Sequence, residues 1–110
     1  MMDETLGKLE QRLQHAPGMD PNQREELLEL VRELRREVQG LSQTHQDEAN
    51  SIAGFAQLSA FEATKERPNP RLVKISLEGL KAAVEQFESS HPRLVRVVNH
   101  ISQMLANLGI

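Results

Sequence analysis

Three polar side chains lie where the helical pattern of this sequence otherwise places apolar ones: His45, Glu48 and His91. Helical bundles build metal sites from imidazole and carboxylate groups that meet between helices. Only one carboxylate is in phase with the two histidines, however, and the Glu-x-x-His spacing of di-iron bundles is missing. We therefore expect no metal and no other cofactor, and interpret the three residues as a polar layer that sets the register between helices. A metal- or ligand-binding bundle centred on His45 and His91 is the alternative.

Other chemistry has little support in the sequence. The absence of cysteine excludes disulfides, thiolate metal sites and cysteine nucleophiles. There is no glycine-rich phosphate loop, no nucleophile elbow and no HExxH pattern, so we expect no enzymatic activity. Arg32, Arg35 and Arg36 alternate with glutamates and are interpreted as a solvated face of mixed charge. With 13 basic against 16 acidic residues, and no aromatic placed to stack on a base, we expect no nucleic-acid partner.

The composition predicts an all-α fold. Aromatic residues make up 3% of the chain, which disfavours a β-sandwich or barrel, while Leu, Glu, Gln, Ala and Arg favour helix. The longest apolar-biased stretch, residues 52–61, is well short of the roughly 20 residues that a membrane span needs. The N-terminus does not resemble a signal peptide, and we expect a cytoplasmic protein. Attachment to a membrane surface is a third, weaker interpretation.

Apolar spacing and helix-boundary residues divide the 110 residues, a single domain, into three helices. A short helix is expected over residues 2–15. A long helix over about 21–64 starts with the cap Asp20 and with Pro21, and it could bend near 40–50, where Gly40 precedes a polar run. A second long helix, over about 70–108, starts after the cap Asn69.

Pro92 interrupts the second long helix. A proline inside a helix removes a hydrogen bond and costs about 3 kcal/mol. The heptad pattern of apolar residues nevertheless continues through Pro92 without a phase error. We therefore expect a kinked but roughly collinear helix, with a break near 89–92 as the alternative.

A short loop between two long helices predicts an antiparallel hairpin. It would pair Leu34 with Ile101 and His45 with His91, in a rod about 60 Å long at 1.5 Å per residue. Such a rod buries only a narrow stripe, and the flanking apolar residues would need cover. These are Leu28, Leu30, Leu72, Ile75, Val95, Val97 and Met104. We expect a homodimer resembling a four-helix bundle, or else an unidentified protein partner. The predicted packing and dimer residues are Ile52, Phe55, Leu58, Phe61, Leu77, Leu80, Val84 and Phe87.

The C-terminal half carries a family resemblance. The segments are Ser51-Ile52-Ala53-Gly54-Phe55, Glu62-Ala63-Thr64, Asn69-Pro70, Ser76-Leu77-Glu78-Gly79-Leu80, Ser90-His91-Pro92 and Asn107-Leu108-Gly109-Ile110. Over about residues 45–110 the chain resembles a family of small bacterial proteins known only as a domain of unknown function. The resemblance implies a bacterial cytoplasmic helical protein and brings no activity, ligand or catalytic residue. The function that we expect is a non-enzymatic self-association or adaptor module.

Overall fold

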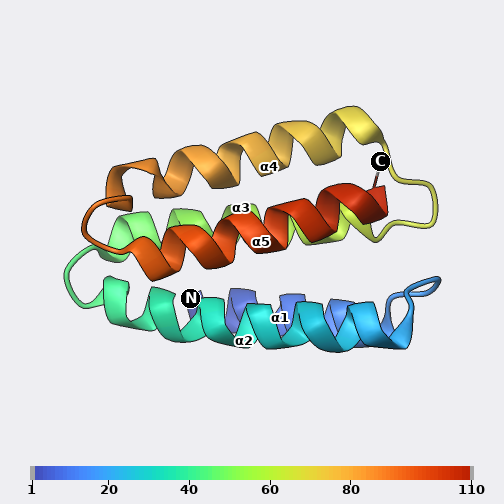
Figure 1. Cartoon of the computed structure of the whole chain (residues 1–110), viewed down its shortest axis with the longest axis horizontal. Coiled ribbons are helices and arrows are strands. Elements are labelled where there is room, and N and C mark those ends of the chain that lie inside the picture. The colour runs from blue at the N-terminus through green and yellow to red at the C-terminus, as the bar shows by residue number, and fades with distance from the viewer. Residues whose placement is uncertain (1, 110) are drawn as a thin grey trace.

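The computed structural model describes residues 2–109, with the side chains of residues 3–108. These residues form helices and connecting turns without a β-strand, which confirms the predicted all-α class. The elements are α1 (Met2–His15), α2 (Pro21–Ser42), α3 (Gln46–Ala63), α4 (Pro70–Val84), the 3-10 turn η1 (Glu85–Phe87) and α5 (Pro92–Gly109). Figure 1 shows the five α-helices of this described part aligned with the long axis of one bundle. No helix among these residues is both long enough and apolar enough to cross a bilayer.

Proline begins three of the helices, since its missing N–H costs nothing in the first turn. At α4 the cap is as predicted: the Asn69 side-chain oxygen accepts a hydrogen bond of 3.0 Å from the Arg71 N–H. At α2 the predicted side-chain cap is wrong, because the Asp20 side chain accepts no hydrogen bond from the helix. Instead the Asp20 backbone carbonyl accepts from the Arg24 N–H at 2.9 Å, which closes the first turn.

The predicted long helix over 21–64 is interrupted, and α2 and α3 are separate helices. The chain leaves helical geometry at His45, whose φ and ψ are −137° and 65°. The N–H groups of Thr44 and His45 both donate to the Leu41 carbonyl, at 3.1 and 2.8 Å, and so end α2. The break also places Asp47 and Glu48 in the first turn of α3, where the helix dipole favours acidic side chains.

The kinked helix expected over 70–108 is wrong, and its alternative, a break near 89–92, is what the structure has, because the chain reverses before Pro92. Helix α4 ends at Val84 and tightens into η1, and the His91 N–H donates to the Phe87 carbonyl at 2.7 Å. Inside a continuous helix the Pro92 ring would clash with the carbonyl four residues earlier, whereas at the start of α5 it has no such neighbour. The steric effect of proline therefore outweighs the continuity of the heptad pattern.

With both long helices folded back, the extended rod is replaced by a bundle of 38 × 24 × 22 Å with a Cα radius of gyration of 12.8 Å. The two reversals, at residues 43–45 and 88–91, lie at the same end of the molecule (Figure 1). Helix α2 packs against α5, and α3 packs against α4. The predicted hairpin paired these same segments. The extended hairpin itself is wrong, because each of its two long helices is divided into two helices that fold back on each other.

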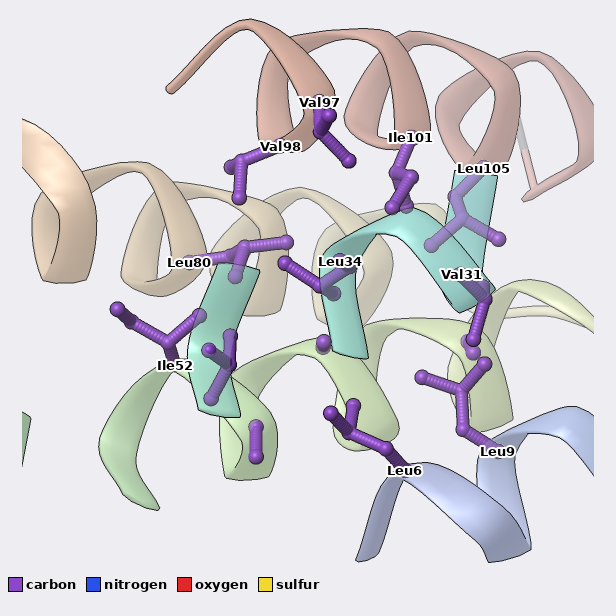
Figure 2. Close-up of a cluster of buried hydrophobic side chains, with 14 of the residues drawn as sticks. Leu6, Leu9, Val31, Leu34, Ile52, Leu80, Val97, Val98, Ile101 and Leu105 are labelled. Carbon is purple, nitrogen blue, oxygen red and sulfur yellow. The ribbon is translucent and has the colours of Figure 1, made fainter. Parts of the chain in front are cut away.

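Helix α3 lies at the centre of the bundle and packs against α1, α2, α4 and α5. Its buried side is mostly alanine, which lets the neighbouring helices approach closely. Leucine, isoleucine and valine from the surrounding helices fill the core, with Leu34 and Ile101 in one cluster (Figure 2). The largest fully buried side chains are Leu6, Leu9, Leu13, Leu27, Val31, Leu34, Leu41, Ile52, Leu80, Leu94, Ile101 and Leu105.

Candidate interaction surface

The outer side of the α3/α4 pair is built around a contact between an aromatic ring and a glycine. Helices α3 and α4 run in opposite directions and pack side by side. A Cβ atom added to Gly79 would lie 2.6 Å from Cδ1 of Phe55, so the ring occupies the space that a larger residue would fill. The absent side chain of Gly79 therefore lets Phe55 lie across α4 and bring the two helices together.

Four large apolar side chains remain exposed around this contact. Among the described residues they are the large hydrophobic side chains that are open to solvent: Phe55 (38% exposed), Leu58 (47%), Leu72 (44%) and Ile75 (59%). Leu58 lies one turn after Phe55 and Ile75 one turn before Gly79, so both come to the same level of the antiparallel pair. We call the surface formed by Phe55, Leu58, Leu72 and Ile75 the apolar face.

The predicted packing residues divide into two groups. Ile52, Leu80, Val84 and Phe87 are buried in the core of the chain itself, so they have no surface left for a second molecule. Phe55 and Leu58 belong to the apolar face, while Phe61 and Leu77 are half-buried. The sequence identified Leu72 and Ile75 only as flanking positions, because which flank is covered depends on how the helices fold back.

Phe61 takes part in a contact within the chain, between α3 and α1. The Arg12 guanidinium of α1 lies over the Phe61 ring, 5.1 Å from its centre. The same guanidinium donates to the Thr64 hydroxyl oxygen at 2.9 Å and to its carbonyl oxygen at 3.4 Å. Because these groups lie at the C-terminal end of α3, the positive charge also complements the helix dipole there. Arg12 thus fixes the first helix against the last turn of α3.

The two histidines of the predicted polar layer lie on the same aromatic ring, at the end where the chain reverses. His45 and His91 each meet Phe87 edge-on, with ring centres 5.3 and 5.5 Å apart. Their Nδ1 atoms are hydrogen-bonded to neighbouring hydroxyl groups, those of Thr44 (2.8 Å) and Ser90 (2.9 Å). The fold therefore brings His45 and His91 together, at the two turns and not inside a helical seam.

These histidines do not assemble a ligand set with Glu48. Glu48 is half-buried in the first turn of α3. Within residues 2–109 there is no group of three histidine, aspartate or glutamate side chains close enough together to hold a metal ion. The described residues therefore give no observation that favours the metal-binding alternative.

The arginines of α2 are divided between solvent and the contact with α1. Arg35 forms ion pairs with Asp3 at 3.5 Å and with Glu10 at 3.3 Å. Gln39 donates a 2.9 Å hydrogen bond to the Asp3 carboxylate, and this bond, helped by Arg35, holds the pKa of Asp3 below its ordinary value of 3.8. Arg32 and Arg36 are exposed. Arg35 therefore serves to dock α1.

A groove between α4 and α5 is a second surface feature, with a volume of about 560 Å³. Leu77 and Ala106 line it together with Lys74, Lys81 and Glu78. Its larger apolar residue, Leu77, is half-buried, so the groove presents less exposed apolar surface than the apolar face. We therefore regard the apolar face as the candidate functional site.

Comparison with protein families gives one match. The family model described as Domain of unknown function (DUF4404) matches residues 2–110. The chain belongs to this family. The match confirms the resemblance seen over residues 45–110 and extends it to the N-terminal helices. Comparisons with curated proteins and with solved structures find no similar protein.

Proposed function

We propose that this DUF4404 chain is a non-enzymatic self-association module that forms a homodimer through its apolar face. The observation that supports this proposal is the placement of the exposed large apolar side chains of the described residues on one side of one helix pair. Scattered exposed apolar residues are normal on a protein surface, whereas a contiguous group of them is typical of an interaction site. As part of the same proposal, the module acts in the bacterial cytoplasm, consistent with the family resemblance and the absence of cysteine.

The size of the face sets the expected affinity. The 15 residues of α4 extend about 22 Å, and two adjacent helices are about 20 Å across. Two copies that cover the whole outer side of the α3/α4 pair would bury roughly 900 Å² in total, which is below the roughly 1,200 Å² at which stable specific interfaces begin. We therefore expect a weak dimer in rapid, concentration-dependent exchange with the monomer.

The test is the mass in solution, measured by sedimentation equilibrium over a wide range of concentration. The wild-type chain should change from monomer to dimer, and Ile75→Glu, which places a charge on the face, should remain a monomer. Arg32→Glu is the matched control, because the same side chain is introduced at an exposed position of α2, outside the α3/α4 pair. A wild-type chain that stays monomeric throughout would overturn the proposal.

A membrane surface is the other occupant that an apolar face can accept. Asp47 and Glu48 lie at one end of α3, and they would repel an anionic lipid surface. Co-sedimentation with anionic vesicles separates the two occupants. Self-association predicts that the chain stays in the supernatant, and vesicle binding abolished by Ile75→Glu would favour the membrane instead.

A further inference from the structure

Charged side chains border the apolar face in a pattern that constrains how two copies can meet. On α4, Arg71 and Glu78 lie two turns apart, and Ile75 lies between them. Both charged residues are exposed, and neither side chain takes part in an ion pair or hydrogen bond within the described chain. The edge of the face thus carries a positive and a negative group with an apolar side chain at the midpoint.

The two ends of the face differ in charge. Asp47 and Glu48 occupy the first turn of α3. Lys65 and Arg67 lie just beyond its last residue, where Lys65 pairs with Glu62 at 3.0 Å and Glu66 offsets the charge of Arg67. The first end is therefore acidic, whereas these four charges cancel, so the positive group that distinguishes the second end is Arg71 in the first turn of α4.

Two faces can meet about a two-fold axis in two simple ways. If the axis runs along the helices, acidic ends meet acidic ends, which is unfavourable. If the axis runs across the helices, α3 packs on α3 and α4 on α4 in opposite directions. The acidic end of each copy then lies away from the acidic end of the other and next to the end that carries Arg71.

We propose that two copies of this chain pack their α3/α4 faces against each other in opposite directions, about a two-fold axis that runs across the helices. Arg71 of each copy then faces Glu78 of the other. This arrangement rests on the proposed self-association. Leu58 and Ile75 lie at the midpoint of the apolar face, so each meets its own symmetry mate near the axis. Leu72, one turn from Ile75, then packs against Phe55 and Gly79 of the second copy.

The geometry makes the charge pair reciprocal. In the antiparallel arrangement, a residue on one side of Ile75 faces the residue at the equivalent distance on the other side. Arg71 is four residues before Ile75 and Glu78 is three residues after it, which matches this requirement to within one residue. The two-fold axis generates the pair twice, so one substitution alters two contacts.

A charge swap tests the arrangement, with sedimentation equilibrium as the measurement. Arg71→Glu and Glu78→Arg should each weaken the dimer roughly ten-fold, because two attractive pairs become two repulsive ones. The double variant R71E/E78R should return to within about three-fold of the wild-type dissociation constant. Within one chain the two side chains are two turns apart, so restoration points to a contact between copies.

Controls separate failure of the arrangement from failure of self-association. Arg32→Glu makes the same charge change at an exposed position of α2 and should leave the dimer unchanged. Far-UV circular dichroism should show equal helicity for all variants. A dimer whose two single losses simply add in the double variant would overturn the antiparallel arrangement but not self-association. A wild-type chain without any dimer would overturn both.

Discussion

Gly79 determines how the apolar face is formed, because its missing side chain gives the Phe55 ring its place on α4. A glycine in a helix interior costs stability, and here the position offers close approach in return. Gly54, in the interior of α3, has open space around its own Cα and no such contact. The two glycines therefore separate the effect of helix propensity from the effect of the ring.

We predict that Gly54→Ala raises the free energy of unfolding by about 0.5–1 kcal/mol, because alanine is the better helix former. Gly79→Ala should gain less or lose stability, since the new methyl group displaces the Phe55 ring. Urea denaturation followed by circular dichroism measures both. An equal gain in the two variants would show that the ring moves aside without cost.

At the junction of α1 and α2, we predict that Gln39→Ala raises the pKa of Asp3 toward 3.8, because the hydrogen bond from Gln39 favours the charged carboxylate. The pKa of Asp3 in the folded chain is below its unfolded value. The stabilisation is therefore present above the unfolded pKa and is lost as the pH falls through the folded one. NMR titration of the Asp3 side chain checks the shift, and an unchanged pKa would contradict the assigned cause.

The candidate site was only partly predictable from residue types. Phe55 and Leu58 were expected to pack, and Leu72 and Ile75 to need cover, because apolar spacing identifies the sides of a helix that avoid water. Spacing alone could not separate these residues from Ile52 or Leu80, which follow the same pattern. The distinction arises because α1, α2 and α5 cover one side of α3, and α5 covers one side of α4, while the other side of the pair stays open.

The elements are connected by polar side chains that satisfy helix ends. Arg24, in the first turns of α2, reaches the end of α1 and donates hydrogen bonds to the backbone carbonyls of Leu13 (2.9 Å), Gln14 (2.5 Å) and Ala16 (2.7 Å). The last carbonyls of a helix have no partner within the helix, and a positive charge there complements the dipole. Gly18, with φ of 75°, turns the chain between the two helices in a conformation that suits glycine.

We predict that Arg24→Ala lowers the free energy of unfolding by about 1–3 kcal/mol, because it leaves partly buried carbonyls unpaired. Arg24→Lys should recover part of the loss, since an ammonium group carries the charge but lacks the guanidinium's spread of donors. Arg32→Ala, exposed on the same helix, should change little. Chemical denaturation compares the three, and equal effects of Arg24→Ala and Arg32→Ala would argue against this cap.

The sequence predicted which residues are helical, and where helices start, better than it predicted where the chain reverses between helices. The heptad pattern continues through His45 and Pro92 although the helices end there. The reason is that α2 pairs with α5 and α3 with α4 both in the extended hairpin and in the folded-back bundle. An apolar pattern records which sides of the helices are buried and carries no information on where the axis reverses. At Pro92 the steric requirement of proline decides the direction, and at residues 43–45 the polar run permits a turn.

The whole molecule has the dimensions of a single compact domain. We predict that small-angle X-ray scattering at low concentration gives a radius of gyration near the 12.8 Å of the Cα trace, plus a small contribution from hydration. An extended hairpin of about 60 Å would give a clearly larger value. The radius should rise with concentration in the wild type and stay constant in Ile75→Glu. A large radius at the lowest concentration would contradict the folded-back arrangement.

Because α3 packs against all four other α-helices, no cut between helices is expected to leave two fragments that each fold alone. Removing the residues after the first reversal would take away the alanine surface of α3 against which α1 and α2 pack. Removing the residues before it would leave that surface of α3 uncovered by α1 and α2. Neither half keeps a closed interior, so we expect all-or-none unfolding in a single transition, with no stable fragment from limited proteolysis.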